Sequence, residues 1–312
     1  MDIWNNWLLI AFVAPFLWAL VNIIDVYFVE SVYEDEYDGA MISGIFQIAP
    51  WLLVPFGMIS FTLPATEAGL LAFFGGSLFL FSFFFYFRAL FSKNDVALIQ
   101  VLWSLSVPLV PFLAWLFIGE RLALLQYMGI VIAFIGAICL SLDPKIRSNG
   151  FAATARIMVL AIFLLSLSMV IEARAYTLAG DFWSIFLLFS LGAAITGTGL
   201  SFFDKKGYAD RLQHIAGLSR KYFLVFFLAE TLALLGTLTS QRAIDLSPAV
   251  SFVAVIESLV PAFVLGISFL LSVMLFEKNR KLARRLYRDQ LVGIRMKMAS
   301  IAIIAFGIYL IA

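Results

Sequence analysis

Two apolar stretches decide how the chain is interpreted. Residues 96–112 read VALIQVLWSLSVPLVPF, and residues 249–265 read AVSFVAVIESLVPAFVL. Each lies within an apolar segment of about twenty residues or more, the length that crosses a bilayer as a helix. Each also carries a proline at the equivalent place, Pro108 in the first and Pro261 in the second. This likeness predicts an internal repeat of membrane-spanning helices.

The repeat extends in the same order on both sides of the two prolines. Aligning the prolines places Ser104 opposite Glu257 and Gln100 opposite Val253. The further matches are Arg88-Ala-Leu with Arg242-Ala-Ile, Gln126-Tyr-Met-Gly129-Ile with Gln290-Leu-Val-Gly293-Ile, Ala14-Pro-Phe-Leu-Trp18 with Ala161-Ile-Phe-Leu-Leu165, and Asp25 with Glu172. Each match is weak alone, but their common order and similar spacing indicate two related halves, residues 1–150 and 151–312.

The composition is that of a membrane protein. Of the 312 residues, 63% are hydrophobic and only 13% are charged, whereas a soluble domain keeps about a quarter of its residues charged. A single core could not bury this much apolar surface, so lipid is the expected solvent. We predict an all-α, multi-pass protein of the cell membrane with ten transmembrane helices. The expected spans are residues 6–29, 40–63, 67–91, 95–118, 123–142, 155–176, 182–203, 221–243, 247–276 and 290–312.

Basic residues are distributed unequally between the two sides of this bundle. Of the 21 Lys and Arg residues, 17 lie in or beside the connections that follow spans one, three, five, seven and nine. The positive-inside rule places these connections in the cytoplasm and both termini outside. Five spans per half is an odd number, so the halves are expected to be inverted relative to each other. Inverted repeats place their binding site near the bilayer midplane, between the halves.

The first half resembles ten-helix members of the drug/metabolite transporter (DMT) superfamily, of the EamA type. The resemblance is carried by Tyr86-Phe-Arg88-Ala-Leu, Pro108, Leu113-Ala-Trp-Leu-Phe-Ile-Gly119-Glu120-Arg-Leu122, Gln126 and Gly129. It implies a transporter with both termini in the cytoplasm, the reverse of the charge-based orientation. The second half departs from the pattern, because Phe276-Glu277-Lys278 stands where a Gly-Glu pair is expected. The resemblance implies no particular substrate.

Glu257 is the leading candidate for substrate binding. A charged group in hydrocarbon costs about 2.5 to 3.5 kcal/mol on insertion scales, so it rarely persists without a purpose or a partner. Pro261 is expected to free the carbonyl of Glu257, and Pro108 that of Ser104, because a helical proline displaces the carbonyl four residues before it. Freed backbone groups at membrane depth need protein or a wet cavity beside them. Two kinks and a carboxylate therefore predict a central cavity.

Other charged residues within the spans have two interpretations each. Arg88 or Arg242 could form an ion pair with Glu257 that only locks helices together. Glu230, Asp25 and Glu172 are candidates for coupling transport to protons, because desolvation favours the neutral form of a carboxylate. Alternatively, Glu230 bonds to a neighbouring helix, while Asp25 and Glu172 lie near helix ends and are hydrated.

Polar residues at helical spacing add further candidate binding residues. The stripes are Trp18, Asn22 and Asp25 in span one, and Gln100, Ser104 and Pro108 in span four. Trp103 beside the second stripe could stack on an aromatic or cationic substrate, or serve only for packing. Gly129, Ala133 and Gly136 in span five are interpreted as a helix-packing stripe.

The remaining features exclude several classes of function. An intramembrane enzyme generally needs a His base, a metal cluster or an activated nucleophile, but His214 is expected in a loop and Cys139 in an apolar span. No Walker motif indicates a primary pump, and no cofactor is expected. The basic run from Lys278 to Arg288 is typical of contact with anionic lipid, not nucleic acid.

The best-supported hypothesis is therefore a non-enzymatic secondary transporter of a small organic solute, such as an amino acid-like or related metabolite, working by alternating access and coupled to protons. A membrane scaffold or lipid scramblase is the alternative. A homodimer is kept as a candidate assembly.

Overall fold

The computed structural model describes residues 3–92, 99, 102–141, 151–204, 206–275 and 294–311. These ranges contain helices, turns and loops, and no strand. The α-helices are α1 (Trp7–Ser31), α2 (Glu36–Phe46), α3 (Thr66–Phe91), α5 (Ser106–Ile118), α6 (Leu124–Ser141), α7 (Phe151–Ala179), α8 (Phe182–Leu200), α9 (Tyr208–Leu246), α10 (Val250–Glu257), α11 (Val260–Leu275) and α13 (Ile294–Ile311). Short 3-10 helices are η1 (Ile3–Asn5), η2 (Ala49–Leu53) and η3 (Ser201–Phe203).

The all-helical prediction is confirmed for the described residues. Seven of their helical segments are long and apolar enough to cross a membrane, so the chain has the character of a multi-pass membrane protein. One of these seven runs through α10 and α11 together, and α5 and α6 are shorter apolar helices. The basic run from Lys278 to Arg288 lies outside the described residues.

Two expected segments were wrong. The second span was expected at residues 40–63, but α2 covers Glu36–Phe46 and is followed by η2, turns and an extended stretch before α3. The connection expected at residues 204–220 is largely helical, because the first part of α9 begins at Tyr208 and runs to a kink at Tyr222, close to the expected start of span eight. His214 therefore lies in a helix. Hydropathy did not indicate this helix, in which Arg211 and His214 face acidic partners described below.

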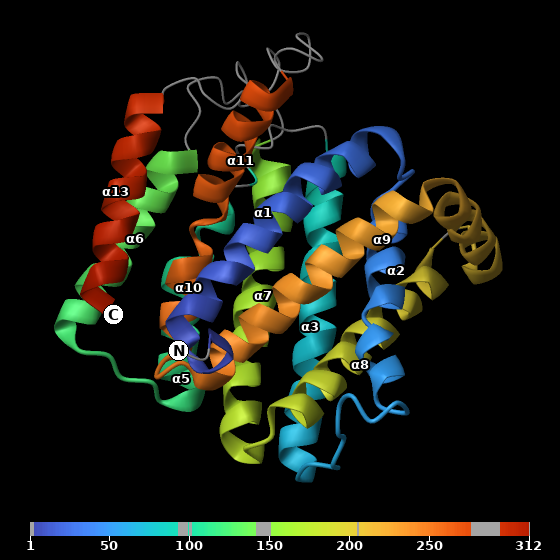
Figure 1. Ribbon diagram of the computed structural model, residues 1–312, viewed down its shortest axis with the longest axis horizontal. Helices are drawn as coiled ribbons and strands as arrows, with labels where there is room; N and C mark the ends of the chain where they lie inside the picture. The colour runs from blue at the N-terminus through green and yellow to red at the C-terminus, as the bar shows by residue number, and fades with distance from the viewer. Residues whose placement is uncertain are drawn as a thin grey trace.

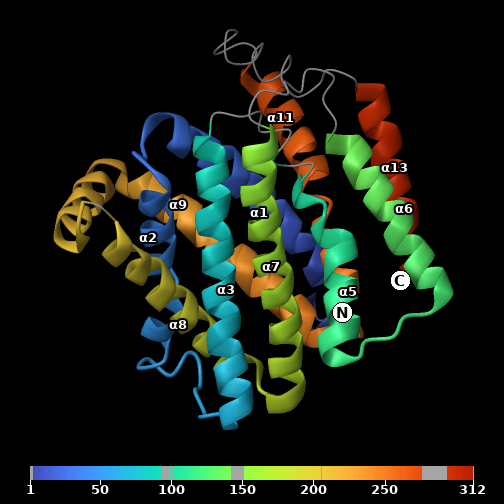
Figure 2. The ribbon, with the colours of Figure 1, turned by 180° about the vertical axis from the view of Figure 1, so that it is seen from behind.

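The helices form one bundle whose neighbours are far apart in sequence. α1 and α9 pack along each other across the front in Figure 1. Figure 2 shows α3 and α7 side by side at the back, and α8 also packs against α3. At one edge α6 pairs with α13, and at the other α2 packs against α8. The centre is therefore enclosed by α1, α3, α7 and α9.

Glycines allow α3 and α8 to meet backbone to backbone. A Cβ on Gly76 would lie 1.8 Å from the carbonyl oxygen of Phe189, and one on Gly192 would lie 1.9 Å from that of Phe73. Neither position has room for a side chain, so this interface depends on residues without a Cβ. The close approach fixes α3 against α8 and thereby positions one wall of the centre.

The small residues of α6 serve the packing role predicted for them. A Cβ on Gly129 would lie 2.7 Å from the carbonyl oxygen of Gly307 in α13, and one on Gly136 would lie 2.8 Å from the Ile304 side chain. Ala133 between them is fully buried. The stripe thus forms the contact between α6 and α13.

Candidate functional site

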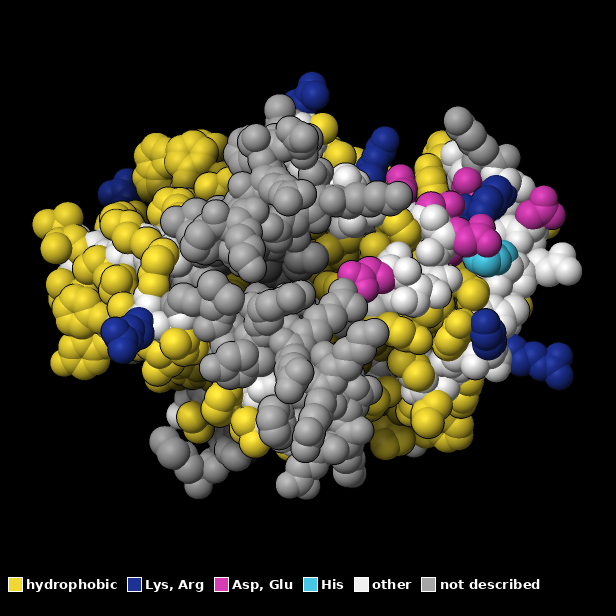
Figure 3. Space-filling model, turned by 90° about the horizontal axis from the view of Figure 1, so that it is seen from above, with side chains coloured by type: hydrophobic (Ala, Val, Ile, Leu, Met, Phe, Trp, Pro, Cys, Tyr) yellow, Lys and Arg dark blue, Asp and Glu magenta, His cyan; other side chains and the backbone are white. Residues whose placement is uncertain are grey.

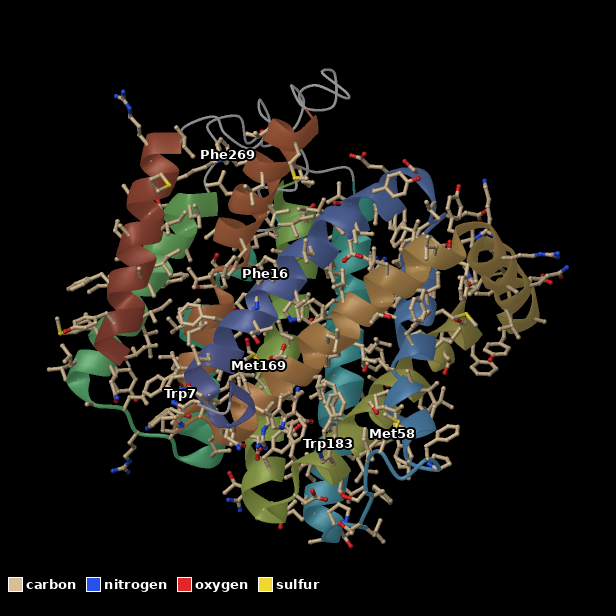
Figure 4. All side chains as sticks on the ribbon, viewed as in Figure 1. Trp7, Phe16, Met58, Met169, Trp183 and Phe269 are labelled. Atoms are coloured by element: carbon tan, nitrogen blue, oxygen red, sulfur yellow. The ribbon has the colours of Figure 1, made fainter. Side chains whose placement is uncertain are left out.

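A partly open cavity lies between α1, α3, α7, α9 and the junction of α10 with α11, with about 790 Å³ of empty space when its open side is included. Five of the predicted binding or coupling residues line it, namely Trp18, Asn22, Asp25, Trp103 and Glu257. Figure 4 places Met169, which also lines it, in the middle of the bundle. The structure therefore brings residues from distant parts of the sequence to one central space.

Glu257 lies where two helices meet. It is the last residue of α10, and Ser258 and Leu259 form a turn before α11 begins at Val260. The hydroxyl of Ser240, on α9, donates a hydrogen bond of 2.5 Å to Oε1 of Glu257. Both residues line the cavity, so the carboxylate is held by α9 at the edge of the open space.

The two proline-containing segments are each interrupted by a turn. One turn separates α10 from α11, and an equivalent turn precedes α5. A serine hydroxyl donates to a nearby backbone carbonyl in each, from Ser106 to Trp103 at 2.9 Å and from Ser258 to Val255 at 2.6 Å. Both prolines then lie in the first turn of the following helix, where a missing N–H leaves no hydrogen bond unmade. The kinks expected at Pro108 and Pro261 are therefore breaks between helices, and a serine hydroxyl bonds to the backbone at each break.

The stripe on α1 faces the cavity. Trp18, Asn22 and Asp25 line it together, as their spacing predicted for a shared face. The hydroxyl of Tyr86, on α3, donates to Oδ1 of Asn22 at 2.6 Å. Asp25 is 6% exposed, so it is not a hydrated residue at a helix end. Its carboxylate forms no hydrogen bond or ion pair with any part of the chain that the structure describes.

A second lobe adjoins the first and contains Glu230. This lobe is also partly open, with about 400 Å³ of empty space when its open side is included, and it shares four lining residues with the first, namely Trp18, Asp25, Phe79 and Phe83. Glu230 accepts a hydrogen bond of 3.1 Å from the hydroxyl of Ser43 on α2. We call the two lobes together the acidic cavity. Asp25 lies on both, between the lobe of Glu257 and the lobe of Glu230.

Two of the predicted residues lie outside the acidic cavity. Ser104 is buried but lines neither lobe, and Gln100 is outside the described residues. Glu172 is fully buried beside α3, where a Cβ on Gly75 would lie 1.7 Å from its Oε1. Neither oxygen of Glu172 has a hydrogen-bond partner among the described residues. It is neither hydrated nor part of the acidic cavity.

The two arginines considered as partners of Glu257 bind other carboxylates. Arg88 lies 3.6 Å from Glu36 and is half exposed. Arg242 lies 2.5 Å from Asp245, in the same helix. The interpretation in which either arginine locks Glu257 is therefore wrong in this structure, because both are used at the ends of the bundle.

A buried charge cluster at one end of the bundle was missed from sequence. The Arg211 side chain is fully buried and contacts Asp35 at 2.8 Å, Asp38 at 2.5 Å and Asp204 at 2.5 Å. His214 lies 3.3 Å from Asp38 at the border of this Arg211 cluster. Acidic, basic and histidine side chains gather in the same region in Figure 3. The cluster ties the start of α9 to the loop between α1 and α2.

Two carboxylates at this end have lowered pKa values. A hydrogen bond from Lys206 and the nearby His214 lower the pKa of Glu34. Burial alone would raise the pKa of Asp204, but hydrogen bonds from Arg211 and from the Lys206 backbone outweigh it and lower the pKa. Both groups are therefore held in the charged form that the cluster requires.

The opposite end is closed by a different contact. Glu120, in the loop after α5, accepts hydrogen bonds from the Ser251 hydroxyl and from the Val250 N–H at 3.0 Å. It therefore caps the start of α10 and not its own span. Burial raises the pKa of Glu120 against these hydrogen bonds. The Arg242 guanidinium also bonds to Asn5 at 3.0 Å, which ties the amino-terminal segment to α9.

Sequence reasoning also missed much of the wall that α9 contributes. Thr237, Ser240 and Gln241 line the first lobe. They follow Glu230 at intervals of seven, ten and eleven residues, which is a polar stripe at helical spacing in an apolar span. That pattern was the available signal. Ser43 on α2 had no such signal, because the second span itself was placed incorrectly.

Comparison with known proteins identifies the fold and nothing finer. No family model and no curated protein sequence matches the chain. A solved structure described only as "Crystal structure of protein" is similar, with a TM-score of 0.60 and 16% identity over 97% of this chain and 94% of that chain. At this identity the likeness concerns the arrangement of helices over nearly the whole of both chains.

Proposed function

We propose that the protein is a secondary transporter that moves a small organic solute by alternating access. The observation that carries the proposal is the acidic cavity, a central space with three carboxylates among its lining residues, one of them at a helix break. Ionisable groups inside a membrane mark substrate or ion pathways by default. Broken helices beside a central cavity are the usual setting of a transporter's binding site.

The packing of the helices supports an inverted repeat. If the halves correspond in order, α1 matches α7 and α3 matches α9, so the contact of α1 with α9 has its counterpart in the contact of α7 with α3. The pairs α2 with α8 and α6 with α13 each join a helix to its own counterpart in the other half. This exchange pattern is what two antiparallel five-span halves would produce. Together with the Tyr86–Gly129 motifs, it favours an EamA-type member of the DMT superfamily.

Contacts between connections support ten crossings. The Arg211 cluster joins the connection after α1 to the connection after α8. Glu120 joins the connection after α5 to the start of α10. Thr62, before α3, lies 3.3 Å from Asp181, before α8. Each of these pairs falls on one side of a ten-span chain, and no described ion pair joins opposite sides.

The two closed ends would act as alternating gates. In this scheme the Arg211 cluster would close one end of the bundle, and the contact of Glu120 with the start of α10 would close the other. Opening one end requires its contacts to break while the other set persists. The carboxylates of the acidic cavity would meanwhile exchange protons or substrate with the open side, which supplies proton coupling.

The proposal is tested with purified protein in liposomes. Counterflow of candidate solutes is measured with and without an inward pH gradient, for the wild type and for Glu257→Gln. We expect the gradient to drive counterflow and Glu257→Gln to abolish it. Glu67→Gln is the matched control, because Glu67 is an exposed carboxylate far from the cavity. Equal solute flux in Glu257→Gln and Glu67→Gln would show that Glu257 is not part of the site. Lipid flipping without solute flux would favour a scramblase.

A further inference from the structure

The acidic cavity has a strongly one-sided charge. Its described lining residues include the carboxylates of Asp25, Glu230 and Glu257, and they include no Lys, Arg or His. The arginines of the ends are already bonded to other acids, Arg211 to its three aspartates and Arg242 to Asp245. A buried carboxylate needs a compensating charge. Within the cavity, that charge has to come from a proton or from a ligand.

Two amide oxygens at the cavity are suited to receive hydrogen bonds. The Oε1 atoms of Gln47 and Gln241, one in each lobe, have no hydrogen-bond partner among the described residues. Asp25 is likewise unbonded in the described chain. Carboxylate and amide oxygens accept hydrogen bonds and cannot donate them. A ligand that complements these atoms carries N–H donors or a positive charge, and a second carboxylate would be repelled.

Aromatic rings surround the shared carboxylate. Trp18, Phe79 and Phe83 line both lobes together with Asp25. The ring centroids of Trp18 and Phe83 are 5.4 Å apart, as are those of Tyr86 and Trp103. Aromatic faces attract ammonium groups through the ring quadrupole and also accept apolar bodies. The aromatic wall and the carboxylate therefore favour the same kind of ligand.

We infer that the acidic cavity binds an organic cation, an ammonium group carried on an apolar body, with Asp25 as the shared ionic partner and Glu257 and Glu230 in the two lobes. This assignment names the substrate class of the transporter proposed above and rests on that function for transport, but not for binding. It excludes an amino acid as the preferred ligand, because the described lining offers no basic group for a carboxylate.

The first test varies the ligand and uses the unaltered protein. Binding to purified protein in detergent is measured by isothermal titration for three compounds with the same ring and a similar chain: (2-phenylethyl)trimethylammonium, 3-phenylpropan-1-ol and 3-phenylpropanoate. We expect the cation to bind at least about tenfold more tightly than the neutral alcohol, and the anion not to bind. Equal affinity for the three, or tighter binding of the anion or of phenylalanine, would overturn the assignment.

The second test varies the cavity. Asp25→Asn, Glu230→Gln and Glu257→Gln each keep the shape of the side chain and remove its charge. We expect Asp25→Asn to weaken binding of the cation by at least about tenfold and to leave the affinity for the alcohol unchanged. Glu67→Gln, which removes the same charge at the surface, should change neither. Should Asp25→Asn bind the cation as the wild type does, Asp25 is not the ionic partner and the inference fails.

The two proposals can fail separately. Binding of the cation without counterflow in liposomes would retain the cation site and reject the transporter. Counterflow of an anionic or zwitterionic solute without cation binding would retain the transporter and reject this substrate class.

Discussion

Removing the guanidinium of Arg211 is the sharpest test of how the ends of the bundle are held. In Arg211→Gln, Asp38 would lose a contact of 2.5 Å and Asp204 two contacts of 2.5 and 2.8 Å. Asp38 is fully buried and Asp204 nearly so. Breaking a buried ion pair by removing one partner typically costs about 3–5 kcal/mol, because the remaining charge is left uncompensated.

The expected loss lies at the lower end of that range. Asp35 and Glu34 at the border of the Arg211 cluster have side chains 29% and 53% exposed, so water reaches the edge of the site and relieves part of the charge. We expect Arg211→Gln to lower the free energy of unfolding by about 3 kcal/mol. The matched control is Lys206→Gln, since Lys206 pairs with Glu34 at the exposed surface and such pairs contribute about 0–1 kcal/mol.

Both variants are measured by unfolding in mixed micelles of detergent and sodium dodecyl sulfate, with intrinsic tryptophan fluorescence as the readout. The double variant Arg211→Gln/Asp38→Asn should recover part of the loss, because one unpaired charge is removed. The reasoning is refuted if Arg211→Gln unfolds at the same detergent fraction as Lys206→Gln, which would mean that water already solvates the cluster.

Three further predictions concern packing, acidity and topology. Gly76→Val should destabilise the protein by at least about 1–3 kcal/mol, since a Cβ at Gly76 would lie 1.8 Å from a backbone carbonyl oxygen. Gly199→Val in α8 is the control and should not destabilise it, since nothing lies within 4 Å of a Cβ at Gly199. Equal unfolding midpoints of the two variants would contradict the close contact. Because the pKa values of Glu34 and Asp204 are lowered on folding, their stabilising contribution should be complete above about pH 5.5 and be lost as the pH falls from there through the lowered pKa values. A stability that stays level from about pH 6 down to about pH 3 would argue against it. In a chain freed of its native cysteine, Glu34→Cys and Arg121→Cys should react with an impermeant maleimide from opposite sides of the membrane, and labelling of both from one side would reject ten crossings.

The fold class was predictable because it depends on composition and on local periodicity. A long apolar segment that crosses lipid is stable as a helix, because a helix satisfies its backbone hydrogen bonds within the segment. The stripe of Trp18, Asn22 and Asp25 could be assigned to one face because helical spacing alone determines it. The prolines likewise indicated where the chain would be interrupted, since a missing N–H is a property of the residue itself.

Other parts of the site depend on partners that are remote in the sequence. Asp25 and Glu172 occupy matching places in the two halves, yet Asp25 lines the acidic cavity and Glu172 lies against Gly75. The packing of α3 against α7 decides this difference, because it buries the Glu172 carboxylate. Arg211 appeared to belong to a polar loop, but it lies in the first part of α9, where three aspartates from two other segments bury it. The sequence by itself determined that the protein would be helical, apolar and interrupted near Pro108 and Pro261, since these are local properties of the chain. The tertiary structure decided which charges are paired and which face the cavity, since these depend on packing between elements that are remote in the sequence, such as Asp35 and Asp38 against Arg211.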